Sequence, residues 1–314
     1  MNDNRISFNI NRRSPLYQFF VAIIFVMGVG GTLSILLILA GGWIFGLELP
    51  VLLNSAISPG AGDIKFIRYL LIVQDISFLL VPSVLIIGMM KSESSGRYPD
   101  FTIPQLKDIG LVILLTFCIF SITSFTGQLN SAMHLPGWLS GIEQWMTEQE
   151  DKTDKTIDLL IDSKSYGTMI LNILNIALLP ALAEELFFRG VFQKIFYNLF
   201  KSGHIAIWVT AFIFSAIHLQ FFGFLPRFIL GLVFGYLFFW SGTLWLPIIS
   251  HFINNAVPVV VTFLQGMDKL NAHDDVSLMH QAIYLPLPVA ISLVILFYFW
   301  NKNRKNKLID AQAN

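Results

Sequence analysis

The chain of 314 residues is strongly apolar, with 55% hydrophobic and 13% charged residues. Together with a mean hydropathy of +0.67, this composition excludes a soluble globular protein and indicates an integral membrane protein with several spans. The net charge is zero at pH 7, which gives no reason to expect nucleic acid as a partner.

A membrane-spanning helix needs roughly 20 mostly apolar residues. The chain contains about eight such segments, and the alternating polar and apolar pattern of a membrane barrel is absent. We therefore predict an all-α, polytopic integral membrane protein, because helices satisfy their backbone hydrogen bonds within the bilayer. The predicted spans are 17–43, 66–90, 106–125, 169–199, 203–220, 224–240, 246–264 and 281–300.

Charged residues indicate how the chain is oriented. Residues 126–167 carry seven acidic residues and three lysines, whereas basic residues cluster before the first span, after the second and fourth, and in the C-terminal tail. Because cytoplasmic segments are rich in lysine and arginine, we predict that both termini are cytoplasmic, in a bacterial cytoplasmic membrane. The basic residues concerned are Arg5, Arg12, Arg13, Lys91, Arg97, Lys107, Lys194, Lys201, Lys302, Arg304, Lys305 and Lys307.

Polar residues divide the chain into four regions. Residues 1–125 form an N-terminal three-helix region with few intramembrane polar groups, and residues 126–167 form a polar, acidic external loop. Residues 168–264 hold most of the polar side chains within spans, and residues 265–314 supply the last span and a basic cytoplasmic tail. We therefore expect the chemistry in residues 168–264.

Two adjacent glutamates, Glu184 and Glu185, lie in the otherwise apolar fourth span. A carboxylate at bilayer depth costs about 2.5 to 3.5 kcal/mol, so two in succession predict a polar site. On a helix Glu185 and Arg189 are neighbours that can pair, whereas Glu184 points about 100° away. Glu184 is therefore the candidate base, and Pro180 should distort the helix before it. The alternative is that the glutamates only hold helices together.

The fifth span places Phe214 and His218 on one helix face at i and i+4. Glu184 lies 17 residues before Lys201 and His218 lies 17 residues after it. If the chain turns near Lys201, Glu184 and His218 lie at similar depth on adjacent antiparallel helices. A single membrane histidine can equally be an interhelical hydrogen-bonding residue.

The seventh span begins with His251 and Asn255, one turn apart, although simple counting places His251 nearer the cytoplasmic end than Glu184. A histidine and an asparagine amide can donate to the oxyanion of a tetrahedral intermediate. A carboxylate and a histidine can deprotonate a water, directly or through a metal. The three polar helices together therefore predict a hydrolase. The His-Glu-x-x-His pattern of many zinc proteases is absent from the sequence.

Three motifs in this order resemble the CPBP intramembrane proteases, also called the CAAX-protease and bacteriocin-processing, or Abi, family. They are Glu-Glu-x-x-x-Arg at 184–189, Phe-x-x-x-His at 214–218 and His-x-x-x-Asn at 251–255. The resemblance covers residues 168–264, and it implies an intramembrane protease with an eight-helix fold.

The resemblance also implies roles for the motif residues. Glu184 and His218 would activate the attacking water, His251 and Asn255 would stabilise the oxyanion, and Glu185, Arg189 and Phe214 would support them. Family members are described as metalloproteases, which implies a metal ion, with zinc as the candidate. Its ligands would be Glu184, His218 and His251.

The predicted function is hydrolysis of a peptide bond in a membrane-associated or lipidated polypeptide. CAAX processing is the family label, and bacteriocin or peptide maturation or immunity is the alternative in a bacterium. A non-catalytic membrane scaffold or immunity protein would use the same polar residues to bind a partner. Gln74 and Asp75 are either auxiliary residues of the site or an interhelical pair. Gly231 and Gly235 form a Gly-x-x-x-Gly pattern, which predicts close helix packing.

Overall fold

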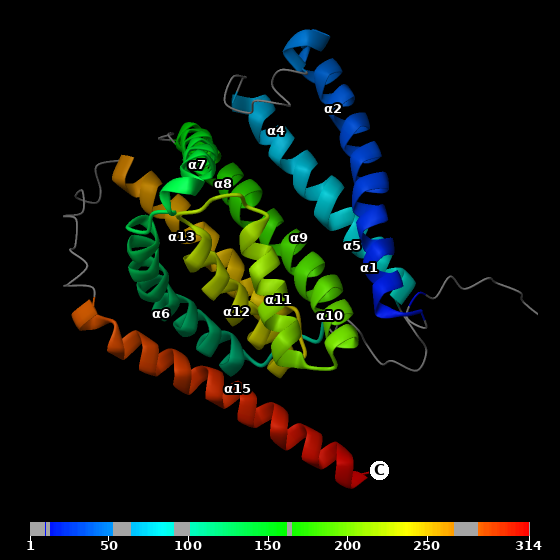
Figure 1. Ribbon diagram of the computed structural model, residues 1–314, viewed down its shortest axis with the longest axis vertical. Helices are drawn as coiled ribbons and strands as arrows, with labels where there is room; N and C mark the ends of the chain where they lie inside the picture. Colours follow the sequence, from blue (N-terminus) through cyan, green and yellow to red (C-terminus); the bar gives the residue numbers. More distant parts are fainter. Residues whose placement is uncertain are drawn as a thin grey trace, which may run out of the picture.

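The computed structural model describes residues 10, 13–52, 64–90, 101–161, 165–266 and 282–313. All regular elements in these residues are helices, which confirms the all-α prediction (Figure 1). The predictions that rest on Arg5, Arg12, Lys91, Arg97 and the side chain of Lys307 lie outside this part of the chain.

The first two spans pack against each other through π-helical turns at the middle of each helix. Gly30, in the first of these turns, lies so close to Ser77 that a Cβ atom would meet the Ser77 carbonyl oxygen at 2.7 Å. The close approach therefore depends on glycine. The elements are α1 (Pro15–Ile24), η2 (Phe25–Gly30) and α2 (Gly31–Phe45), then α4 (Ile64–Gln74), η3 (Asp75–Leu80) and α5 (Val81–Met90).

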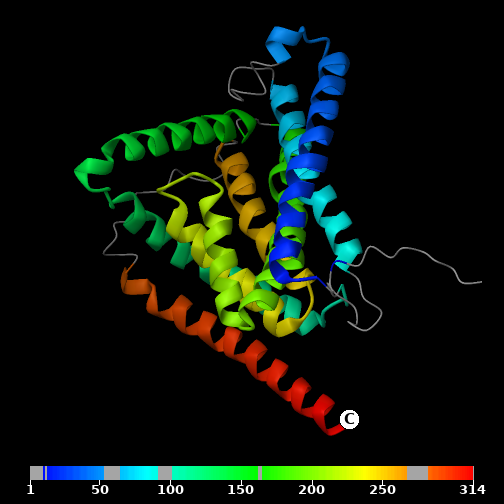
Figure 2. The same cartoon turned by 45° about the vertical axis from the view of Figure 1, so that its right-hand side comes forward.

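The segment predicted as a polar external loop is mostly helical. After α6 (Leu106–Ser131) a short 3₁₀ turn, η4 (Gly137–Leu139), leads into α7 (Ser140–Ile161). Figure 2 shows α7 lying across one end of the helix bundle.

The second half of the chain builds the interior of the bundle. Phe200 ends the fourth span, Lys201 adopts a left-handed conformation with φ of 54°, and the Ser202 side chain accepts a hydrogen bond from the Ile205 amide. These features reverse the chain and cap the next helix. The elements are α8 (Tyr166–Asn172), η5 (Ile173–Leu178), α9 (Leu179–Phe187), η6 (Phe188–Phe192), α10 (Gln193–Phe200), α11 (Gly203–Ala216), α12 (Phe224–Ser241), α13 (Trp245–Gly266) and α15 (Pro286–Ala313).

Six helices in the described part of the chain are long and apolar enough to cross a membrane. The predicted fifth span corresponds to α11, which is apolar but shorter, and the predicted eighth span corresponds to α15, which is not among the six. Large apolar side chains on the outside of the spans, such as Phe20, Ile35 and Leu36, are exposed. In a bilayer these side chains face lipid, so the chain is a polytopic membrane protein.

The Gly-x-x-x-Gly pattern of α12 brings this helix against α11. A Cβ atom on Gly231 would lie 3.0 Å from the Cα atom of Ala211, and one on Gly235 would lie 2.8 Å from a side-chain carbon of Ile207. The predicted packing face is therefore confirmed. It fixes α11 against the helix that precedes α13 and His251. His218, which the sequence placed on the same helix as Phe214, lies in the turn just after α11 ends at Ala216.

Candidate active site

The fourth span is distorted on both sides of Glu184. The π-helical segment η5 ends two residues before Pro180, and a second π-helical segment, η6, follows α9. Pro180 has no N–H, so it cannot bond the Ile176 carbonyl as a residue within a regular helix would. The predicted distortion is thus present, and π-helical turns often occur at functional sites.

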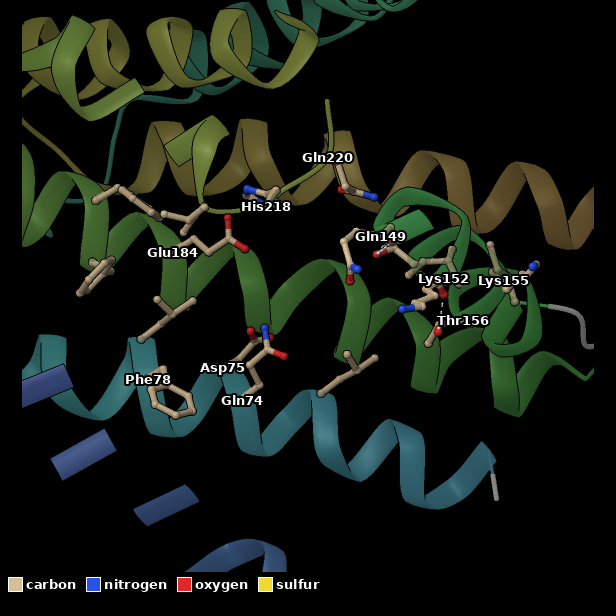
Figure 3. Close-up of a pocket in the computed structure, with 18 of the residues that line it drawn as sticks. Gln74, Asp75, Phe78, Gln149, Lys152, Lys155, Thr156, Glu184, His218 and Gln220 are labelled. Carbon is tan, nitrogen blue, oxygen red and sulfur yellow. Dashed lines mark hydrogen bonds between the residues drawn. The ribbon is translucent and has the colours of Figure 1, made fainter. Parts of the chain in front are cut away.

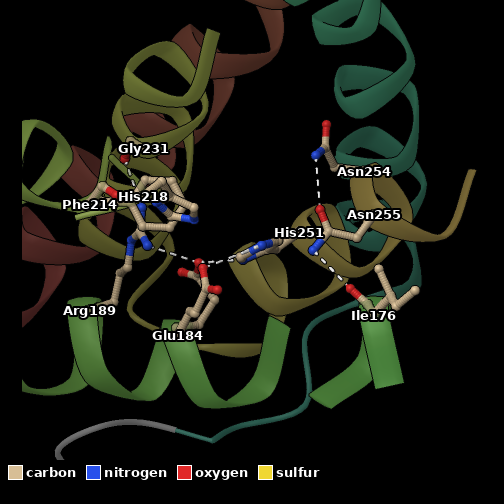
Figure 4. A network of polar contacts seen from close by, with 10 residues as sticks. Ile176, Glu184, Arg189, Phe214, His218, Gly231, His251, Asn254 and Asn255 are labelled. Atoms are coloured by element: carbon tan, nitrogen blue, oxygen red, sulfur yellow. Dashed lines mark hydrogen bonds and ion pairs between the residues drawn. The ribbon is translucent and has the colours of Figure 1, made fainter. Parts of the chain in front are cut away.

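The adjacent glutamates have different surroundings, as their positions on the helix predict. Glu185 is fully buried, and its Oε1 atom accepts hydrogen bonds from Arg189 Nη1 and His251 Nδ1, both at 2.9 Å (Figure 4). The predicted pair between Glu185 and Arg189 is therefore present. A buried charge pair needs such partners, because an unpaired charge at this depth is costly.

Arg189 lies in a closed aromatic environment. Its guanidinium carbon lies 5.9, 5.1 and 5.4 Å from the ring centres of Phe188, Phe214 and Phe234, and Nη2 donates to the Gly231 carbonyl at 3.0 Å. Phe214, the first residue of the second motif, thus packs on the arginine of the first motif. The rings exclude water from the charge pair and add cation–π attraction.

The histidines each have one ring nitrogen bound by a protein acceptor. His251 Nδ1 contacts Glu185, and His218 Nδ1 lies 2.7 Å from the carbonyl oxygen of Phe214. With Nδ1 as the donor in both rings, each neutral imidazole keeps the lone pair of Nε2. In His251 this Nε2 atom lies 3.8 Å from Glu184 Oε2.

His251 and Glu184 therefore lie at the same level, contrary to the simple residue count. The fourth span is 35 residues long, from Tyr166 to Phe200. At about 1.5 Å per residue it is much longer than the bilayer core. Its end therefore projects beyond the start of α13 at Trp245, which explains how His251 reaches Glu184.

Glu184 differs from Glu185 in that it borders a cavity. The cavity has a volume of about 1750 Å³, and Glu184, His218, Gln74 and Asp75 line it (Figure 3). Glu184 Oε2 is buried and has no hydrogen-bond partner among the described residues. A buried carboxylate oxygen needs a partner. The Glu184 side chain as a whole is 15% exposed, so its carboxylate lies between the buried side of Oε2 and the cavity.

Gln74 and Asp75 belong to the same cavity rather than to a separate pair. Both lie on the second span and face the Glu184 side chain across the cavity (Figure 3). Asp75 is 8% exposed, so its carboxyl group is almost enclosed. The auxiliary position suggested by the sequence therefore fits the geometry.

Asn255 lies one turn beyond His251 and is not among the residues that line this cavity. Its amide nitrogen is 3.5 Å from the Ile176 carbonyl oxygen, and its own oxygen accepts from Asn254 at 3.1 Å. Ile176 is the residue four before Pro180, so the Asn255 amide reaches the carbonyl that Pro180, which has no N–H, cannot bond. The oxyanion role of Asn255 stays a prediction.

The zinc ion implied by the family resemblance requires three converging donors. Glu184, His218 and His251 are of suitable chemical type, and both histidines keep Nε2 free. However, no group of three or more His, Cys, Asp or Glu side chains in the described part of the chain is arranged to hold a metal ion. As they stand, these side chains do not form a zinc site.

One wall of the cavity was not predicted as part of the site. Gln149, Lys152, Thr153 and Thr156 of α7 line it, about one helix turn apart. The sequence places these side chains in a polar, acidic segment that carries no catalytic motif. Their spacing on one helix face is the signal that indicates a shared surface.

The comparisons with known proteins address the family. Residues 166–257 match the family model described as "Type II CAAX prenyl endopeptidase Rce1-like". "Uncharacterized protein YpbD" of Bacillus subtilis (strain 168) is 35% identical over 90 residues, which are 27% of this chain and 43% of that protein. The matched segment thus spans less than half of this relative. No solved structure gives a significant match.

The matched residues contain the three motifs that carried the resemblance, together with α8 to α12 and the first half of α13. The model describes endopeptidases, which agrees with a polar site built from glutamates and histidines inside a membrane protein. The family resemblance is therefore confirmed for residues 166–257, which are similar to the Rce1-like family of CAAX-type endopeptidases.

Proposed function

We propose that this protein is an intramembrane endopeptidase in which Glu184 activates the water that attacks a peptide bond. The observation that supports this most strongly is the buried Oε2 atom of Glu184. It has no hydrogen-bond partner among the described residues and lies 3.8 Å from His251 Nε2, and the Glu184 side chain borders a cavity that His218 also lines. A general base needs this kind of access to a reacting water.

In the proposed reaction Glu184 accepts one proton and later donates one proton. Glu184 takes a proton from water while the hydroxide oxygen bonds to the carbonyl carbon of the substrate. The tetrahedral intermediate then breaks at the C–N bond, and protonated Glu184 gives its proton to the leaving amine. The products are a peptide with a new carboxylate and a peptide with a new amine, so atoms and charges balance.

The histidines support the two charged states of this reaction. His218, held through Nδ1, presents Nε2 to the cavity and orients the water with Glu184. His251 can donate from Nε2 to the oxyanion only when both its ring nitrogens carry protons. Glu185, which accepts from Nδ1, holds the His251 ring in one orientation, as the buried aspartate does in serine proteases. Asn255 would join the oxyanion site if its amide left the Ile176 carbonyl.

The proposed substrate is a membrane-associated or lipidated polypeptide. Apolar residues from the first, second, fourth and fifth spans line the cavity, which suits a chain that lies in or next to the bilayer. In a bacterial cytoplasmic membrane the substrate would be a peptide or membrane protein, and peptide maturation or immunity would be the biological role. A non-catalytic scaffold would bind such a segment without cleaving it.

Comparison of peptide termini separates the protease from the scaffold. Membranes are prepared from a host that expresses the wild type or Glu184→Gln at equal levels. The peptide termini that the membrane proteins carry before digestion for analysis are then mapped. New termini are expected with the wild type and not with Glu184→Gln, because glutamine cannot accept the water proton. Glu148→Gln on the exposed surface of α7 is the matched control. New termini that persist in Glu184→Gln would refute the mechanism.

A further inference from the structure

One face of the second span lines the cavity that contains Glu184. Leu71, Asp75 and Phe78 lie four and three residues apart, and all three line the cavity together with Gln74. Residues with this spacing share one side of a helix. Asp75 begins the π-helical segment η3, which packs against α9, the helix that carries Glu184. Figure 3 accordingly shows Asp75 and Gln74 on the side of the cavity that faces Glu184.

The Asp75 carboxylate is buried without a partner in the part of the chain that the structure describes. Asp75 is 8% exposed, and neither Asp75 nor Gln74 has a side-chain hydrogen bond or an ion pair with a described residue. Asp108, which is 4% exposed, has such partners: it accepts from Lys302 Nζ at 2.6 Å and from Tyr298 Oη at 3.1 Å. A buried carboxylate is costly without them, and most costly at bilayer depth. Asp75 therefore needs a partner from outside these residues.

The cavity does not supply a cation to Asp75. Arg189 is bound to Glu185 and to the Gly231 carbonyl behind the cavity wall. The described residues that line the cavity include two cations, Lys152 and Lys155, but both belong to α7 and neither forms an ion pair with Asp75.

The charge around Asp75 is therefore negative. Glu184 and Asp75 lie in the same cavity, and two carboxylates in one site disfavour each other's charge. A positive group that enters is attracted by both carboxylates, and the surrounding apolar walls strengthen this attraction.

The shape and chemistry of these walls suit a basic side chain. Leu71, Phe78, Phe19 and Ile213 are among the apolar residues that line the cavity. Lysine and arginine combine an apolar stem with a charged end, so the stem can lie along such a wall while the end reaches a carboxylate. Arginine can also bind a carboxylate with two parallel hydrogen bonds.

We propose that Asp75, with the side-chain oxygen of Gln74, forms a cation-binding subsite that receives a lysine or arginine side chain of the substrate near the bond that is cleaved. The inference rests on the proposed proteolytic function, and it identifies the substrate class as membrane-associated polypeptides with a basic residue close to the cleavage site. The basic side chain supplies the partner of Asp75 and places the peptide bond beside Glu184. Asp75 is thus a specificity-determining residue and takes no part in the proton transfers.

Mapping of peptide termini tests this specificity. Sites that only the wild type cleaves should carry lysine or arginine within about three residues of the bond, a distance of about 10 Å in an extended chain. Asp75→Asn should lower cleavage at these sites about 30-fold or more, because the charged partner is lost. Asp75→Glu should restore it. Asp158→Asn removes a carboxylate from α7 in the same cavity and should keep the basic preference. A basic preference that persists in Asp75→Asn would overturn the proposal.

Matched peptides separate binding from chemistry. A peptide that spans one mapped site is compared with the same peptide in which norleucine replaces the basic residue. Purified wild type should favour the basic peptide about 30-fold in kcat/KM, mainly through KM, and Asp75→Asn should cleave both peptides equally. Equal cleavage of the two peptides by the wild type would contradict the subsite.

Thermal unfolding tests the state of Asp75 without requiring activity. Asp75→Asn removes a charge that has no described partner, so its midpoint should equal or exceed that of the wild type. Asp108→Asn is the matched comparison, since it breaks an ion pair with Lys302 and should lower the midpoint. A fall in Asp75→Asn as large as that in Asp108→Asn would show that Asp75 holds helices together, which would overturn the proposal.

The subsite and the proteolysis fail in different ways. Identical termini with the wild type and Glu184→Gln would refute the proteolysis and, with it, the substrate class, whereas the comparison of Asp75→Asn with Asp108→Asn would still decide whether Asp75 is structural. If cleavage depends on Glu184 but keeps its sequence preference in Asp75→Asn, the protease assignment stands and the cation-binding subsite is refuted.

Discussion

The central interaction at the residue scale is the buried contact of Glu185 with both Arg189 and His251. Glu185 leaves Glu184 free, because Arg189 and the Nδ1 atom of His251 both bind the second glutamate. Adjacent carboxylates thus take separate roles, one structural and one facing the cavity. The sequence predicted this division from helix geometry, since residues one apart point about 100° from each other.

Removal of one partner of the buried pair should be much worse than removal of both. Arg189→Leu leaves Glu185 charged in an apolar environment and should destabilise the protein by about 3–5 kcal/mol. The double change Glu185→Gln with Arg189→Leu should recover part of this loss. Thermal unfolding in detergent measures both variants, with exposed Arg304→Leu as the control. A double variant less stable than Arg189→Leu would contradict the account.

The proposed mechanism also predicts the response to metal removal. Because Glu184 accepts the water proton itself, and the donors do not form a zinc site as they stand, cleavage should persist after dialysis against a zinc chelator. The metal content of the dialysed protein is measured in the same sample. Loss of cleavage that zinc alone restores would assign Glu184, His218 and His251 to a metal instead.

At the element scale, glycines and π-helical turns determine which helices meet. Gly231 and Gly235 on α12 allow α11 to approach, and their carbonyl oxygens accept bonds from Arg189 and Gln193 of the fourth span. The glycine pattern was readable from the sequence. The π-helical turns were not, because they depend on tertiary contacts rather than on a residue type, apart from the one near Pro180.

A side chain at Gly231 should separate α11 from α12. Gly231→Leu would place carbon atoms against Ala211 and Phe214, and such overpacking typically costs about 1–3 kcal/mol. Arg189 would also lose its bond to the Gly231 carbonyl. We expect a lower thermal midpoint and reduced cleavage. Gly110→Leu is the control, since a Cβ atom there meets nothing within 4 Å. Equal stability of the two variants would contradict this packing.

The contact between α7 and the segment that follows His218 should depend on pH. Burial raises the pKa of Glu150, although the hydrogen bond from Phe222 and the charge of Arg227 oppose this, while Asp154 and Asp151 add to it. A raised pKa in the folded state means that stabilisation by the bound proton is present at low pH and is lost as the pH rises through the folded-state value.

Glu150→Gln removes this titration and keeps an oxygen that can accept from the Phe222 amide. Its thermal midpoint relative to the wild type should therefore be higher at about pH 8 than at about pH 4. Glu148→Gln, on the same helix, is the control. A difference between Glu150→Gln and the wild type that does not change with pH would show that burial of the charge has no effect on stability.

At the scale of the whole molecule, the sequence predicted the helical class, the family and the three polar helices, because apolar length and short motifs are local features. It did not predict that 140–161 would be a helix at the cavity, since no motif marks a surface formed by distant segments. A count of residues from the ends of the spans also placed His251 nearer the cytoplasmic end than Glu184. Such a count assumes that all spans end at the same depth. The fourth span is longer than the others.

The molecule therefore combines a closed polar pair, a carboxylate that borders a cavity, and a helix, α7, that forms one wall of that cavity. The central claim is that Glu184 activates water for peptide hydrolysis. Membranes that contain the wild type or Glu184→Gln are incubated in ¹⁸O-labelled water, and new peptide C-termini are examined by mass spectrometry. We expect ¹⁸O in new C-termini with the wild type and a reduction of about 100- to 10,000-fold with Glu184→Gln. Equal ¹⁸O incorporation by the two proteins would contradict the account.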